Sequence, residues 1–175
     1  MARLGLIALL ATLVACSYAA KFSDCGGSHA RFLAIGVPST IKVQEGFTLS
    51  VPFHARVSRA FTSTSLQVKL KIERSLGWFG HQNICGLTGG FCDRRVNCAQ
   101  LNDVVNKFLL APKPHFECPF TVGDYNFPLN IKVPKLDIPG AIKVLGAGTY
   151  RLTAEFYDNG RKTGCFKLED VRVQF

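Results

Sequence analysis

The strongest constraint on how this chain can fold is a strict alternation of apolar with polar or small residues in three segments. Every second residue is apolar over 47–57, 66–72 and 150–156. Successive side chains of a β-strand point to opposite faces, so this period predicts three strands that each bury one face. Asn159-Gly160 follows the third segment and suits the two positive-φ positions of a tight hairpin turn, after which a last strand runs to the end of the chain.

Shorter strand candidates fill much of the remaining sequence. They lie at 31–35, 41–43, 120–127 and 129–133 and are interrupted by prolines, which suit sheet edges and loops. Seven or eight strands at this spacing are typical of an all-β fold, and we expect an immunoglobulin-like antiparallel β-sandwich or β-cup.

One segment has a helical period instead. Its apolar residues recur at spacings of three and four, at Leu101, Val104, Val105 and Phe108. Asn97 precedes this run and Gln100 follows three residues later, which is the spacing of a capping box. The sequence therefore predicts one short helix in an otherwise β protein.

The first twenty residues indicate the compartment. A basic start, an apolar run over 4–15 and small residues near position 19 match a secretory signal peptide, and the run is shorter than the roughly 20 residues of a membrane-spanning helix. An alternative is a bacterial lipoprotein box, in which Cys16 would be lipidated and kept. We expect residues 1–19 to be a signal peptide and residues 20–175 to form a single domain.

Removal of Cys16 with the signal peptide leaves an even number of cysteines, as expected of a secreted disulfide framework. They are Cys25, Cys85, Cys92, Cys98, Cys118 and Cys165. The residues alone leave the pairing open.

The balance of charge is basic. Lysine and arginine number 21 against 12 aspartate and glutamate, which gives a formal net charge of +9. The basic residues are scattered over the expected strands, without a groove-reading helix or the signature of an RNA-binding sheet. We therefore expect a solvated basic surface that favours anionic membranes, and no nucleic-acid partner.

Sequence signals for catalysis are missing. The chain holds no Gly-x-Ser-x-Gly nucleophile elbow, its six remaining cysteines can all pair, and its 4 histidines stand apart without metal-ligand spacing. We expect no enzyme activity, no cofactor and no metal site.

Two apolar segments occur where loops are expected. Residues 76–80 place Trp78 beside Phe79, and residues 138–146 are apolar apart from one lysine. Two interpretations stay open. The segments fold back as core plugs or a sheet edge, or they form flexible lips around a cavity that touch a membrane, with Trp78 at the headgroup level.

The order of motifs along the chain resembles that of a known family. The motifs are Phe22–Gly26, Val68–Arg74, the cluster Cys85, Cys92 and Cys98, then Cys118–Phe120, Gly123–Tyr125, Val133–Pro139, Gly148–Leu152 and Gly164-Cys165. No single motif is specific, but the ordered set is similar to the ML lipid-recognition family, and within it to the ganglioside activators, which carry sphingolipids. Those activators have a further cysteine pair where this chain has residues 111–115.

The resemblance implies specific pairings and sites. The implied disulfides are Cys25–Cys165, Cys85–Cys92 and Cys98–Cys118. The expected lips around the mouth of a lipid cavity are Trp78, Phe79, Ile138, Ile142, Val144 and Leu145. The inward-facing strand residues expected to line that cavity are Phe53, Leu70, Ile72, Leu152 and Phe156.

We therefore expect a secreted, non-enzymatic lipid carrier that takes up the acyl chains of a lipid or glycolipid and presents the headgroup. Two alternatives stay open: a secreted recognition protein of innate defence or chemical sensing that acts with a receptor, and a direct cofactor of a lipid hydrolase such as a glycosidase. The chain has no Asn-x-Ser/Thr sequon, which favours an extracellular over a lysosomal destination.

Overall fold

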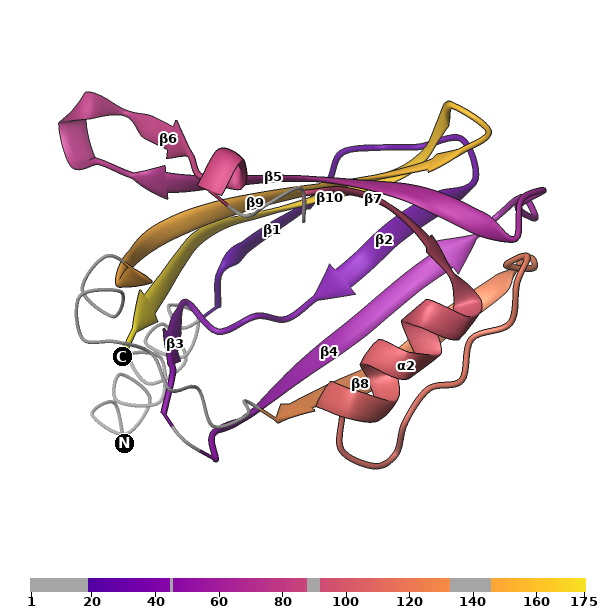
Figure 1. The fold of residues 1–175 in the computed structure, drawn as a ribbon, viewed down its shortest axis with the longest axis horizontal. Helices are drawn as coiled ribbons and strands as arrows, with labels where there is room; N and C mark the ends of the chain where they lie inside the picture. Colours follow the sequence, from indigo (N-terminus) through magenta and orange to yellow (C-terminus); the bar gives the residue numbers. More distant parts are fainter. Residues whose placement is uncertain (1–18, 45, 88–91, 133–145) are drawn as a thin grey trace, which may run out of the picture.

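Two β-sheets face each other in the computed structural model, with one α-helix beside them (Figure 1). The structure describes residues 19–44, 46–87, 92–132 and 146–175. The helix is α2 (Cys98–Phe108), and two single 3-10 turns are η1 (Gly77–Phe79) and η2 (Cys85–Leu87). This all-β sandwich with one short helix confirms the predicted fold class.

The larger sheet has seven strands among the described residues. Its main path runs through β1 (Lys21–Asp24), β10 (Arg161–Gln174), β9 (Gly148–Asp158), β5 (Ser65–Ser75) and β6 (His81–Asn83). Two further strands pair off this path, β3 (Thr40–Lys42) with β10 and β7 (Asp93–Asn97) with β5. All these pairs are antiparallel except the short parallel pair of β3 and β10.

The smaller sheet has three antiparallel strands. Their order is β2 (Ala30–Ile35), β4 (Thr48–Val57) and β8 (Gly123–Lys132). β8 runs without a break where the sequence predicts two strands around a proline. Pro128 lies opposite Pro52, so both missing N–H groups fall at one register position and pairing continues on either side.

The alternating segments form the strands that they predict. Residues 47–57, 66–72 and 150–156 fall almost entirely within β4, β5 and β9. The hairpin turn is also confirmed, because Asn159 and Gly160 both have positive φ, at 49° and 78°, between the paired strands β9 and β10.

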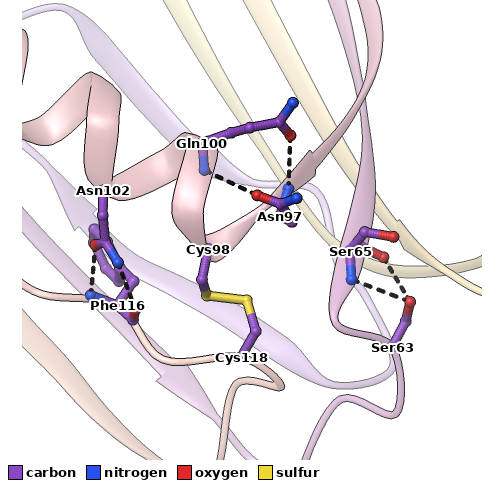
Figure 2. Close-up of a disulfide and its surroundings, with 8 residues drawn as sticks. All are labelled: Ser63, Ser65, Asn97, Cys98, Gln100, Asn102, Phe116 and Cys118. Atoms are coloured by element: carbon purple, nitrogen blue, oxygen red, sulfur yellow. Dashed lines mark hydrogen bonds between the residues drawn. A yellow bond between two sulfur atoms is a disulfide. The ribbon is translucent and has the colours of Figure 1, made fainter.

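The predicted capping box is present at the start of α2. The Asn97 side chain accepts a hydrogen bond from the Gln100 backbone N–H at 2.9 Å, and the Gln100 side chain accepts one from the Asn97 N–H at 3.1 Å (Figure 2). Two of the free N–H groups of the first turn are thereby satisfied, which fixes the residue at which the helix begins.

Three disulfides close the fold. Cys25 pairs with Cys165, Cys85 with Cys92, and Cys98 with Cys118, which is the set that the family resemblance implies. The first bond joins the end of β1 to β10 across 140 residues of sequence. In the chain-entropy model, closing a loop of that length stabilises the fold by on the order of 5 kcal/mol.

The buried core has two parts. One cluster is built around Phe32, Val51 and Leu168, and the other around Val57 and Phe61. Among the described residues no helix is long and apolar enough to cross a membrane. The predicted signal peptide, except its last residue, and Cys16 lie outside the described residues.

Candidate functional site

An apolar cavity of about 490 Å³ lies between the two sheets. Its walls are Ala30 and Phe32 of β2, Phe53, Ala55 and Val57 of β4, Leu66 of β5, Tyr125, Phe127, Leu129 and Ile131 of β8, Phe156 of β9, Gly164 and Phe166 of β10, Leu101, Val104, Val105 and Phe108 of α2, and Phe61, Leu109, Phe116 and Phe120 of the connections. The one hydroxyl among these side chains, that of Tyr125, donates to the Thr121 carbonyl at 3.0 Å. An occupant of the cavity therefore meets apolar side chains.

The alternating period of β4 and β8 builds the wall of the smaller sheet. Odd-numbered residues face the cavity over 53–57 of β4 and 125–131 of β8, and the register places Phe53 opposite Phe127 and Ala55 opposite Tyr125. The Phe53 and Phe127 rings stack with centroids 5.2 Å apart. Because side chains alternate strictly along a strand, two aligned apolar faces give one continuous wall.

The helix α2 closes the side of the sandwich between the two sheets. It follows β7, which pairs with β5 of the larger sheet, and leads through a connection to β8, which pairs with β4 of the smaller sheet (Figure 1). Val105 is buried, with 5% of its surface exposed, and points to the cavity, whereas its neighbour Val104 lines the cavity and is 52% exposed. The cavity wall thus reaches the molecular surface at Val104.

A loop packs along α2, and we call the two together the cover (residues 98–122). The Cys98–Cys118 disulfide joins their ends. The amide of Asn102 accepts from the Phe116 N–H at 2.9 Å and donates to the Phe116 carbonyl at 2.8 Å (Figure 2). The Phe116 ring makes edge contacts with the Phe120 and Phe127 rings at 5.9 and 5.7 Å. Asn102 therefore holds the backbone of a cavity-wall residue in place.

The residues expected to line the cavity divide into two groups. Phe53 and Phe156 lie in its wall. Leu70, Ile72 and Leu152 are not among the lining residues; Ile72 pairs with Leu152 across β5 and β9, and Leu152 packs against the core cluster of Phe32 and Leu168. Alternation identifies a buried face, but it does not tell whether a position on that face meets a neighbour or a hollow.

Of the residues expected to form the lips, the structure describes Trp78 and Phe79, and neither is among the residues that line the cavity. Trp78 and Phe79 occupy η1 at the tip of the β5–β6 hairpin, where they are 92% and 80% exposed, and their rings meet edge to face with centroids 5.5 Å apart. In Figure 1 this hairpin projects at the left, while α2 lies at the lower right. Their exposure excludes the core-plug interpretation of this segment. Ile138, Ile142, Val144 and Leu145 lie outside the described residues.

Several wall residues escaped the sequence prediction. The helical period predicts the inner face of α2 but not its place against a cavity, and Phe61 and Phe116 lie in connections without any period. Phe120 belongs to the strand candidate 120–127 but lies in the connection before β8, which begins at Gly123. The available signal was composition. The segment between the predicted helix and β8 holds Phe116 and Phe120.

Charged side chains gather outside the cavity. Lys162, and then Tyr157, hydrogen-bond the Glu155 carboxylate and hold the pKa of that group below its ordinary value of 4.5. Asp158 is buried and accepts three hydrogen bonds from Thr62 and Ser63.

Within the described parts of the chain, no three His, Cys, Asp or Glu side chains gather closely enough to hold a metal ion.

Comparison with known proteins gives distant similarities of fold. No protein-family model and no curated protein matches the sequence. A Niemann-Pick type C2 protein from the Japanese carpenter ant has a similar structure at a TM-score of 0.48 and 15% identity, over 88% of this chain and 99% of that one. The C-terminal domain of wzt gives a TM-score of 0.30 at 12% identity, over 91% of this chain and 81% of that domain. Similarities at this level assign neither a family nor a function to the chain.

Proposed function

We propose that this protein binds the hydrocarbon part of a lipid in the cavity and leaves the polar headgroup at the surface. The observation that carries the proposal is the cavity of about 490 Å³ with apolar walls, a volume within the range of about 300–1,000 Å³ typical of ligand sites. Water in such a site would lack the two to four polar partners that hold a buried water, whereas a hydrocarbon chain needs none.

The volume of the cavity favours one long chain. A water-sized group, to which a methylene is close, takes roughly 30 Å³, so 490 Å³ holds roughly sixteen such groups. Burying a methylene stabilises it by about 0.8 kcal/mol relative to water, but a chain in a bilayer already has that gain. The protein would therefore leave the equilibrium of transfer nearly unchanged and lower the barrier, by sparing the chain a passage through water.

The tip of the β5–β6 hairpin supports a role at membranes. Trp78 and Phe79 are exposed, and aromatic rings favour the headgroup level of a bilayer. The net charge of +9 draws the protein toward anionic surfaces. On this proposal the hairpin tip, together with Ile138, Ile142, Val144 and Leu145, makes transient contact with the membrane from which lipid is taken.

The resemblance to the ML lipid-recognition family and its ganglioside activators supports a carrier that presents a glycolipid headgroup. A glycosidase or a receptor would meet that headgroup outside the cavity. The one ionisable side chain of the cavity walls is Tyr125, whose hydroxyl is bound to the Thr121 carbonyl, so we assign the protein no catalytic step of its own. Three disulfides suit an oxidising compartment, and we propose secretion to the extracellular space, with the lysosome as the alternative.

A transfer assay between vesicles tests the proposal. Donor vesicles of phosphatidylcholine and phosphatidylserine carry a pyrene-labelled fatty acid, and unlabelled vesicles accept it. We expect the purified protein, at amounts well below those of the lipid, to increase the rate of transfer in proportion to its concentration. A rate that stays at the spontaneous value even with protein in excess would reject the proposed function.

A further inference from the structure

We propose that the hydrocarbon chain enters the cavity past the Val104 flank of α2, and that Asn102 on the opposite flank controls how readily this entrance opens. The inference rests on the proposed function, because it supposes that a chain occupies the cavity. It adds the route by which the chain enters the cavity and the residue that controls the rate of entry.

The wall of the cavity is not equally closed all round. Backbone pairing joins β4 to β8 along their length and β9 to β10 with register shifts at Lys162/Gly164 and Leu168/Val171, so neighbouring strands of each wall are held to one another by backbone hydrogen bonds. The wall made by α2 is different, because a helix satisfies its backbone groups internally and meets its neighbours through side chains. Val104, which lines the cavity and is 52% exposed, marks the place where this wall is thin.

The two flanks of α2 differ in how they are held. Two residues along a helix advance by about 200°, so Asn102 and Val104 lie on nearly opposite flanks. On the Asn102 flank the helix is tied to its loop by both hydrogen bonds to Phe116, and Lys113 Nζ donates to the Asn106 carbonyl at 2.9 Å. The Val104 flank presents an aliphatic side chain that contacts the cavity. Hydrogen bonds thus hold the helix to its loop along the Asn102 flank.

Two backbone hydrogen bonds tie the cover to the rest of the fold, and both lie near the ends of its loop. The Leu110 N–H donates to the Asn130 carbonyl of β8 at 2.7 Å, and the Phe61 N–H donates to the Phe120 carbonyl at 2.9 Å. Between these points the cover rests on the cavity through apolar side chains. A small rotation of α2 about its fastened flank would lift Val104 and leave the strands undisturbed.

Stopped-flow kinetics with cis-parinaric acid, whose fluorescence rises in an apolar environment, test the entrance. Val104→Arg places a long, charged side chain across the opening, with its head in water. We expect entry and exit to slow at least tenfold together. Val122→Arg is the matched control, because Val122 is 63% exposed and does not line the cavity; its rates should stay within twofold of those of the unmodified chain.

Asn102→Ala tests the control of opening. Loss of both hydrogen bonds to Phe116 should speed entry and exit several-fold, with the dissociation constant changed by less than twofold. Asn102→Asp keeps the shape but loses the donor to the Phe116 carbonyl, and should show the same effect on the rates. A purely structural Asn102 would instead lower the melting temperature and leave both rates unchanged.

The outcomes separate the two proposals. Rates within twofold of the unmodified chain for Val104→Arg, or for both Asn102 variants, with folding verified by circular dichroism, would overturn the proposed entrance while lipid binding stands. Failure of the unmodified chain to bind cis-parinaric acid at all would instead reject the proposed function, and the entrance with it.

Discussion

Phe53 and Phe156 line the same cavity from opposite sheets, the first from β4 and the second from β9. The ring of Phe32 contacts both, with centroid distances of 6.1 Å to Phe53 and 5.4 Å to Phe156. Phe32 is itself part of the core cluster that contains Leu168. The three rings therefore connect the packed core cluster to the adjacent cavity.

Narrowing the cavity with a larger side chain should weaken binding without unfolding the protein. Ala55 is buried, lies in the cavity wall and is opposite Tyr125 in the register of β4 and β8. In Ala55→Phe the added ring has empty space to enter, so we expect the free energy of unfolding to change by less than about 2 kcal/mol. The affinity for cis-parinaric acid should fall at least tenfold in a fluorescence titration.

Leu33→Phe is the control for that variant, because Leu33 lies on β2 and is partly exposed. Its affinity should match that of the unmodified chain. Full binding by Ala55→Phe would mean that the ligand lies somewhere other than this cavity.

The aromatic contacts of Phe32 predict its contribution to stability. Its side chain is buried and meets the rings of Phe53, Phe156 and Phe166. Phe32→Ala removes these contacts and enlarges the hollow, so we expect a loss of about 3–5 kcal/mol in the free energy of unfolding. Urea denaturation followed by circular dichroism measures it, and a loss below about 1 kcal/mol would contradict the packing described.

The buried carboxylate of Asp158 fixes the connection that carries Phe61. It accepts from the Thr62 N–H at 2.7 Å, from the Thr62 hydroxyl at 2.9 Å and from the Ser63 N–H at 3.1 Å. Asp158→Ala leaves these donors without their acceptor, which should cost about 2–3 kcal/mol of stability. Because Phe61 lines the cavity, affinity for the fatty acid should fall as well. A variant as stable as the unmodified chain would show that the connection is held by other contacts.

Removing the two aromatic rings at the tip of the β5–β6 hairpin should weaken membrane binding and leave folding unchanged. Trp78→Ala combined with Phe79→Ala changes two exposed residues, so the free energy of unfolding should stay within about 0.5 kcal/mol. Co-sedimentation with phosphatidylserine vesicles should weaken several-fold, and extraction of lipid from these vesicles should slow. Uptake of cis-parinaric acid from water should be unaffected, since neither ring lines the cavity. Unchanged co-sedimentation would remove the membrane role of the hairpin.

The pair of Lys162 and Glu155 predicts a dependence of stability on pH. The 2.9 Å contact with Lys162 lowers the pKa of Glu155 in the folded state, so as the pH falls below about 4.5 the unfolded chain takes up the proton first. The contribution of the pair is therefore complete above that pH and is lost as the pH falls through the folded-state pKa.

In Lys162→Met this contribution should disappear. Because both side chains are about one-third exposed, the difference in unfolding free energy between about pH 7 and about pH 3 should shrink by only about 0.5 kcal/mol. Guanidinium titrations at the two pH values measure this difference. An identical pH dependence in variant and unmodified chain would contradict the lowered pKa.

The parts of the fold that the sequence predicts are those governed by local rules. Alternation gives β4, β5 and β9 because side-chain direction in a strand depends on the backbone alone. Asn97 and Gln100 give the start of α2 because the groups that cap a helix lie within four residues of each other. The disulfide pairing came from the family resemblance, since six cysteines alone leave it undetermined.

The parts that escaped prediction depend on how distant elements meet. Phe53 and Leu70 have the same apolar pattern, yet only Phe53 lies in the cavity wall, because the hollow is placed by the separation of the sheets and by α2 beside them. Pro128 was expected to break a strand, and its pairing with Pro52 depends on a register that neither strand encodes by itself. The role of Asn102 depends on Phe116, fourteen residues away in a loop without a repeating pattern.

Native mass spectrometry of the protein after incubation with mixed lipid vesicles tests the central claim most directly. A cavity of about 490 Å³ predicts a single bound lipid per chain, released on organic extraction as a species with a long hydrocarbon chain, and much less of this complex for Ala55→Phe. A folded protein that shows only its own mass across all the lipids offered would contradict the account.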